Sequence, residues 1–141
     1  MPDEQVVIYS RVLSCDPVRN ANCPEPAEQV AGCREHLESQ GLDEGASAEA
    51  LLDDAGAGAS LIRPGLQELQ RMIVERRVST VVVFTLSCLS ARIDDLSRLW
   101  ALFKARGVRL VAVRESIDTA TVPGRSTLEV LTRPVALRLS A

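Results

Sequence analysis

Arg11 is the residue of this sequence whose presence is hardest to explain by folding alone. It stands within residues 6–12, an otherwise apolar run with the composition of a buried strand. A buried guanidinium gains nothing from such a place without a partner, because an unpaired charge is costly to remove from water. We therefore expect Arg11 to contact an anion, and phosphate is an anion that arginine recognises well.

A second segment that could meet phosphate is the run of small residues 53–60, Asp-Asp-Ala-Gly-Ala-Gly-Ala-Ser. Glycine-rich loops can cradle phosphate through their backbone N–H groups, but this one lacks the Gly-Lys-Ser/Thr ending of a P-loop. Taken by itself, the composition is more typical of a mobile surface loop. Arg63 follows this loop, directly before Pro64.

A metal site is the third kind of chemistry to consider. Cys15, Cys23, Cys33 and His36 could supply four ligands. Their spacing lacks the Cys-x-x-Cys pairs typical of zinc sites, and Cys33 falls at a core position of a predicted helix. We therefore expect neither a metal nor another cofactor, and we expect Cys88, at the end of a buried strand, to be a core residue.

Composition and charge limit the function. The chain has 141 residues, 46% of them apolar, 25% charged and 3% aromatic, which suits one soluble domain. So few aromatic residues argue against binding of single-stranded nucleic acid by base stacking. The net charge of −3 is also unlike that of a free-standing DNA-binding protein. The basic groups at residues 71–77 and 98–109 are expected to be solvated helix faces.

No apolar run reaches the length of a membrane span, and the N-terminus lacks a basic-then-apolar signal peptide. The sequence therefore predicts a cytoplasmic protein that does not contact membranes and whose cysteines are reduced.

Alternating strands and helices must position these residues. Strands are predicted at 6–12, 78–86 and 108–113, the last two apolar and rich in valine. Helices are predicted at 26–40, from Pro64 with Leu66, Leu69, Ile73 and Val74 on one face, at 94–106 with Gly107 at its end, and from Arg125 to Thr132. Residues 46–52 are expected to be helical or irregular, and 119–124 to form a turn. This alternation predicts an α/β fold of three layers, with a mainly parallel central sheet flanked by helices.

Four segments, in this order, resemble the N-terminal catalytic domain of the serine recombinases, the resolvase/invertase family. They are residues 9–12 (Tyr-Ser-Arg-Val), residues 28–34, residues 54–66 with Ile-Arg-Pro-Gly-Leu at their end, and the stretches between 81 and 125 that include Ile-Asp-Thr and Pro-Gly-Arg. No single segment is specific, but their joint order is. The resemblance covers about the whole chain and implies a resolvase-like fold.

The resemblance also implies a chemistry. In such enzymes a serine oxygen attacks the DNA phosphodiester and forms a phosphoserine link, and arginines stabilise the phosphate without a metal. The family's nucleophile position is Leu13 here, so Ser14 is the catalytic candidate if the strand end holds one extra residue. Arg11 and Arg63 are the matching catalytic arginines. Arg11, Arg63 and Arg125 are the residues expected to bind DNA phosphate, with Arg11 and Arg63 close together at one edge of the sheet.

Other parts of the family's site are replaced. Its Asp-Arg-Leu-x-Arg motif corresponds to residues 87–91, Ser-Cys-Leu-Ser-Ala, and its loop serine to Ala57. Loss of one preorganised charge typically costs about a hundredfold to a thousandfold in rate. We therefore expect DNA strand cleavage and exchange to be absent or strongly impaired. The alternative is a non-catalytic module that pairs with an active recombinase or another partner.

The organisation expected from the sequence is one resolvase-type catalytic domain over residues 1–141. Pro134 would interrupt the long helix that follows in the family, and no DNA-binding domain is expected after it. The expected partners are DNA and a second recombinase-type chain, as a homodimer or heterodimer.

Overall fold

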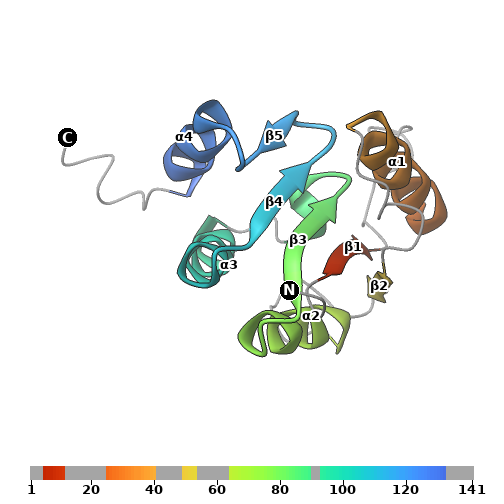
Figure 1. Cartoon of the computed structure of the whole chain (residues 1–141), viewed down its shortest axis with the longest axis horizontal. Coiled ribbons are helices and arrows are strands. Elements are labelled where there is room, and N and C mark those ends of the chain that lie inside the picture. The colour runs from red at the N-terminus through yellow and green to blue at the C-terminus, as the bar shows by residue number, and fades with distance from the viewer. Residues whose placement is uncertain (1–4, 12–24, 41–48, 54–63, 90–92, 133–141) are drawn as a thin grey trace.

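The computed structural model of the chain describes residues 5–11, 25–40, 49–53, 64–89 and 93–132. It contains one sheet, in the order β2-β1-β3-β4-β5, formed by β1 (Gln5–Arg11), β2 (Glu49–Asp53), β3 (Val78–Val83), β4 (Arg109–Ala112) and β5 (Ile117–Asp118). The first four strands are parallel, and β5 runs antiparallel to β4. The predicted mainly parallel sheet is confirmed (Figure 1).

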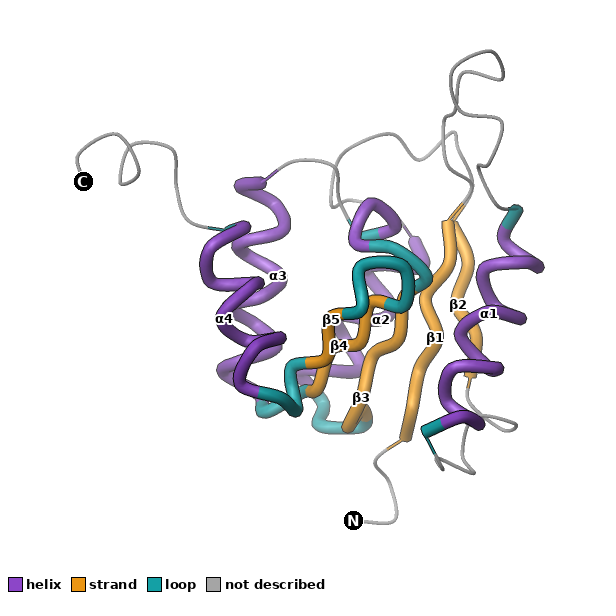
Figure 2. Tube along the Cα trace, turned by 90° about the horizontal axis from the view of Figure 1, so that it is seen from above, coloured by secondary structure: helices purple, strands orange, loops and turns teal. Residues whose placement is uncertain are grey.

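Helices cover both faces of the sheet. Helix α1 (Pro26–Ser39) lies on one side, and α2 (Pro64–Val74), α3 (Ile93–Arg106) and α4 (Val122–Leu131) lie on the other (Figure 2). Side chains of β1 alternate between the two cores, because successive strand residues point to opposite faces. Val7 and Tyr9 pack with α2 and α3, whereas Val6 and Ile8 pack with α1. The three-layer α/β architecture is confirmed.

The amphipathic pattern of the helices holds with one exception. All four apolar residues predicted to face inward on α3, Leu96, Leu99, Trp100 and Phe103, are buried, and Gly107 ends the helix with a positive φ of 67°. On α2, Val74 was predicted to face the core but is 50% exposed, and Met72 is buried in its place. Val74 is the last residue of α2, and the buried face of the helix ends at Ile73.

Three other element predictions are wrong. Residues 49–53 form β2, although Glu-Ala-Leu-Leu-Asp favours a helix, because pairing with Val7–Arg11 of β1 overrides the local preference. Strand β3 ends at Val83, and a short 3₁₀ helix, Leu86–Cys88, occupies the end of the predicted strand. Helix α4 begins at Val122, because Thr121 caps it by accepting a hydrogen bond from the N–H of Gly124, and proline fits a first helical turn.

Within the described residues, no helix is long and apolar enough to cross a membrane.

Candidate functional site

The strand order makes the carboxyl end of β1 a topological switch point of the sheet. From β1 the chain crosses to β2 on one side and later to β3 on the other, so the connections diverge above β1. In open α/β sheets ligands bind outside the carboxyl ends of the strands at such a switch point. Arg11 is the last residue of β1, and the 3₁₀ helix with Cys88 follows the end of β3. The residue expected to meet an anion therefore stands at the switch point.

Gln29 of α1 holds the backbone of Arg11. The backbone N–H of Arg11 donates to Oε1 of Gln29 at 3.2 Å, and Nε2 of Gln29 donates to the carbonyl oxygen of Arg11 at 2.8 Å. Gln29 is 0% exposed, and the Nε atom of Arg11 is also buried. The base of the Arg11 side chain is thus enclosed in the fold.

Cys88 completes this cluster. Its thiol donates to Oε1 of Gln29 at 3.2 Å, and the side chain is fully buried, which confirms the prediction of a core cysteine. Burial raises the pKa of Cys88, with a smaller contribution in the same direction from Glu115 and an opposing one from Arg11. The thiol therefore stays protonated at neutral pH and acts as a hydrogen-bond donor, not as a nucleophile.

Glu115 brings a negative charge to the same end of the sheet. Its Oε2 accepts from the hydroxyl of Thr85 at 2.7 Å, and both carboxylate oxygens accept from the N–H of Leu86, at 3.2 and 3.3 Å. A carboxylate at the start of the 3₁₀ helix satisfies a backbone N–H that the helix itself leaves open. The cation Arg11 and the anion Glu115 both act on the pKa of Cys88, so both lie in its neighbourhood.

The other residues predicted for the edge of the sheet cannot be placed beside Arg11. Ser14 and Arg63 lie outside the described residues, as do Leu13, Ala57, Ala91 and Pro134. The expected closeness of Arg11 and Arg63 therefore remains a prediction. Ser10, the described serine of β1, is 1% exposed and belongs to the strand interior.

Arg125, the third predicted phosphate-binding residue, lies elsewhere. It lines a pocket of about 360 Å³ between α3, the start of β4 and the β5–α4 connection, with Trp100 and Phe103 in the walls. Its Nη1 donates to the carbonyl oxygen of Thr119 at 2.9 Å, and Thr119 bonds to Leu110 near the beginning of β4. Arg11 ends β1 at the opposite, carboxyl side of the sheet, so the two arginines do not form one site.

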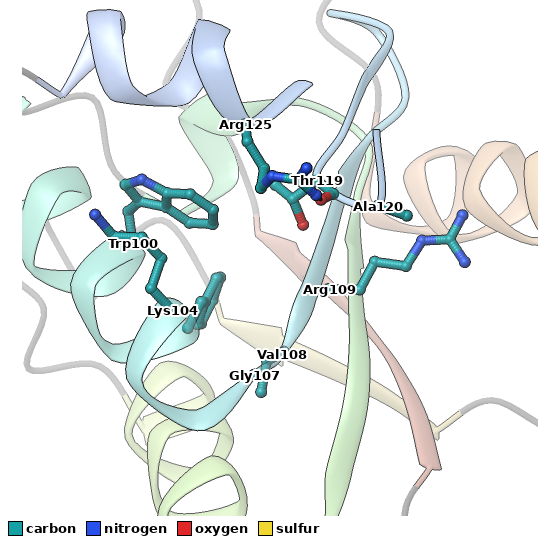
Figure 3. A pocket seen from close by; sticks show the side chains of 9 residues that line it. Trp100, Lys104, Gly107, Val108, Arg109, Thr119, Ala120 and Arg125 are labelled. Carbon is teal, nitrogen blue, oxygen red and sulfur yellow. The ribbon is translucent and has the colours of Figure 1, made fainter. Parts of the chain in front are cut away.

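Figure 3 shows Arg125 between Trp100 and Thr119, whereas the Arg109 side chain extends away from them. Arg109 pairs with Asp118, and its guanidinium lowers the pKa of that carboxyl. Lys104 pairs with Glu129 at 2.7 Å. On α2, Arg71 pairs with Glu68 and Glu75, as expected of a solvated helix face.

A metal has no evident place in the described part of the chain, where no three His, Cys, Asp or Glu side chains are grouped to hold an ion. Cys33 is buried between α1 and the sheet, and the other two cysteines considered for zinc lie outside the described residues.

The motif-based prediction gave no site role to Gln29, Thr85 or Glu115. One signal was present for Gln29: residues 29, 33 and 37 are four apart, so Gln29 shares a helix face with Cys33 and Leu37. A glutamine on an otherwise apolar stripe indicates a buried polar contact. Glu115 carries no such pattern, because it lies in a turn.

Comparison with known proteins identifies relatives of this arrangement. The family model described as "Resolvase, N terminal domain" matches residues 6–133. The N-terminal catalytic domain of TP901-1 integrase is similar with a TM-score of 0.72 and 26% identity, over 92% of each chain. The search of curated proteins finds no match.

Two further structures are similar over shorter parts. The C-terminal catalytic domain of ISC1926 TnpA, an IS607-like serine recombinase, has a TM-score of 0.60 and 25% identity, over 77% of this chain and 67% of that one. A serine recombinase from Sulfolobus solfataricus has a TM-score of 0.55 and 28% identity, over 78% and 68% of the two chains.

Proposed function

This chain belongs to the resolvase family of serine recombinases, and on that premise we propose that it binds the DNA backbone at the carboxyl edge of its sheet and cleaves DNA weakly or not at all. Arg11 is the cation that meets the scissile phosphate. Arg63 is the second phosphate contact, and Ser14 is the residue that would attack phosphorus if cleavage survives. Domains of this family act on DNA. What we add is the identity of the residues that contact the phosphate and a lower rate of DNA cleavage.

The observation that carries the proposal is the position of Arg11 at the switch point of the sheet, anchored by Gln29. The reduced activity is supported by the residues that follow β3. In place of the family's aspartate and first arginine the chain has Ser87 and Cys88, and Cys88 is fully buried beside Gln29. Groups that act as a unit do not replace one another, so Arg11 and Arg63 without the other arginines stabilise the transition state poorly.

Binding to a fluorescent DNA duplex of random sequence tests the role of Arg11, because phosphate contacts do not depend on sequence. We expect Arg11→Ala to weaken binding and to reduce the slope of log affinity against log salt by about 1. An exposed arginine of α2, Arg71→Ala, is the matched control and should leave the slope unchanged. Equal slopes for Arg11→Ala and the unsubstituted chain would exclude a phosphate contact at Arg11.

Trapping of covalent complexes on supercoiled DNA tests the chemistry. We expect adducts to form at least about a hundredfold more slowly than with a recombinase of the family that keeps its arginines. Any adduct should map to Ser14, should disappear in Ser14→Ala, and should survive in a variant of an exposed serine, Ser126→Ala. Rapid adduct formation would show that the site still cleaves DNA although several of the family's residues are replaced.

Arg125 is proposed as a separate contact to the DNA backbone. Its guanidinium is exposed, and no ion pair is found for it among the described residues, so its charge is available to an anion. Because the pocket of Arg125 lies away from Arg11, the effects of Arg125→Ala and Arg11→Ala on affinity should add. A non-additive pair would place both arginines in one site.

A pairing function is favoured by α4, whose exposed face includes three large apolar side chains beside polar ones. Val122, Val130 and Leu131 are 66%, 56% and 41% exposed. Domains of this family often form dimers, and we propose that a second copy of the chain covers this face. Sedimentation equilibrium should show a dimer whose dissociation constant rises at least about tenfold in Val130→Asp. A chain that stays monomeric at all concentrations would contradict the proposal. A cytoplasmic location fits both the DNA partner and the absence of a disulfide at Cys33 and Cys88.

A further inference from the structure

Gln29 is a fully buried polar residue in an otherwise apolar interface. The interface between α1 and the sheet is built from Val6, Ile8, Cys33, Leu37, Val82 and Val111. An amide in such surroundings is favourable only when its donor and acceptor are both satisfied. The partners of Gln29 therefore indicate what the side chain does.

The side-chain amide of Gln29 makes two hydrogen bonds to the backbone of Arg11. Oε1 accepts from the N–H of Arg11 at 3.2 Å, and Nε2 donates to its carbonyl oxygen at 2.8 Å. The pairing of β1 with β3 is in register only as far as Tyr9 opposite Val83, two residues before Arg11. A primary amide carries a donor and an acceptor side by side, as a peptide group does. Arg11 is in register with Asp53 of β2, and beyond the end of the β3 pairing Gln29 supplies its N–H and carbonyl oxygen with a further pair of hydrogen bonds.

Cys88 fixes the orientation of this amide. Its thiol donates to Oε1 at 3.2 Å, and the same oxygen already accepts from Arg11. Rotation of the amide by half a turn would place its NH₂ group against two donors, so only one orientation is favourable. The segment after β3 is thereby connected to the end of β1 through Gln29.

We propose that Gln29 is a positioning residue for Arg11: it fixes the last residue of β1 so that the guanidinium remains at the switch point of the sheet. The inference rests on the proposed phosphate contact of Arg11 and adds the residue that holds this cation in place. An arginine on an anchored backbone loses less conformational freedom when it binds an anion, which favours binding. Gln29 itself does not touch the phosphate.

Hydrogen exchange of the Arg11 amide tests the anchoring without DNA. Gln29→Leu keeps a side chain of similar size and removes all three hydrogen bonds. We expect the protection of the Arg11 amide to fall at least about tenfold, while Val7 and Ile8 change less. Leu37→Ala is the control, because it weakens the packing of the same helix but leaves the three hydrogen bonds. If Gln29→Leu and Leu37→Ala affect the Arg11 amide equally, Gln29 has only a structural role.

A double-substitution cycle tests the link to binding. With the random-sequence duplex as probe, Gln29→Leu should weaken binding in the Arg11 background at least about threefold and have almost no effect in the Arg11→Ala background. The exposed glutamine of α2, Gln67→Leu, should leave affinity unchanged. Equal losses from Gln29→Leu in both backgrounds would overturn the proposal, because Gln29 would then act independently of Arg11.

The two levels of inference fail in different ways. If Arg11→Ala does not alter DNA binding, the proposed function is wrong, and the exchange experiment alone decides whether Gln29 anchors Arg11. If Arg11 matters for binding but Gln29→Leu has no effect on either measurement, the positioning role is wrong and the proposed function stands.

Discussion

Cys33 lies between α1 and the sheet with an exposed fraction of 0%. Burial raises the pKa of its thiol to about 12, and neighbouring Cys88 acts in the same direction. The unfolded chain exposes the same thiol, which then loses its proton near the usual pKa of 9.0. Because the folded state keeps the proton to higher pH, unfolding releases a proton in alkaline solution, and the protein becomes less stable as the pH rises.

We predict that this thiol makes a measurable contribution to alkaline destabilisation. Its stabilising effect is fully present below pH 9 and is lost as the pH rises toward 12, with a slope of about 1.4 kcal/mol per pH unit in the free energy of unfolding. Urea titrations should show almost no difference between Cys33→Ala and the unsubstituted chain below pH 9.0, and above it a slope that becomes smaller in Cys33→Ala, approaching this amount as the pH rises. The substitution also leaves a cavity, but that cost is independent of pH. Parallel pH profiles for the two proteins would contradict a buried, protonated Cys33.

At the same scale, the sequence revealed some residues of the site and not others. Arg11 was identifiable because a charge in an apolar strand is conspicuous in the sequence itself. The role of Gln29 depends on a contact with Arg11 across 18 positions of sequence, which no local pattern encodes. Glu115 reaches Thr85 across 30 positions in the same way. Residues with unusual surroundings in the chain were predictable, and those defined by a tertiary contact were not.

The start of α4 depends on one glycine. A Cβ atom on Gly124 would lie 2.0 Å from the carbonyl oxygen of Asp118 and 2.6 Å from its carbonyl carbon, both backbone atoms of β5. We predict that Gly124→Ala lowers the free energy of unfolding by more than about 3 kcal/mol, because neither element can move without breaking the cap at Thr121.

A second glycine provides the control for this prediction. On Gly32 of α1 a Cβ would meet the ring of Phe84 at 2.9 Å, the mobile end of a side chain. Gly32→Ala also favours the helix by about 1 kcal/mol, so its net effect should stay within about 1 kcal/mol of zero. Chemical denaturation of both variants measures the difference. If Gly124→Ala is as stable as Gly32→Ala, α4 does not pack directly on β5.

Elements with a strong local signal were predictable, and the remaining ones were not. Valine-rich β3 and amphipathic α3 were identified because each encodes its own burial pattern. Strand β2 was missed because Glu49–Asp53 becomes a strand only through its pairing with β1. The start of α4 was placed three residues late, because Pro123 and Gly124 were interpreted as a turn although both fit a capped first helical turn.

The whole molecule is built around two cores of unequal size. Among the described residues, one contains 21 buried residues from β1, β3, β4, β5, the helices α2, α3 and α4, and the segments next to these elements. The other contains six, and α1 is the helix that covers it. Since less apolar surface holds α1 in place, its detachment requires less free energy than unfolding of the sheet. The residue that anchors Arg11 therefore lies on the layer that opens most easily.

Native-state hydrogen exchange should resolve this difference. We predict that the free energy of opening of the buried amides of α1 is at least about 1.4 kcal/mol lower than that of the amides of β3 and β4. This difference corresponds to an about tenfold lower protection factor. Because Gln29 connects α1 to Arg11, the Arg11 amide should exchange with α1 and not with Ile8 in the middle of the same strand. Binding of DNA at Arg11 should then raise the protection of α1 by linkage, since it stabilises only the closed form. An α1 that exchanges with the same free energy as β3 would show that the two layers unfold as one unit.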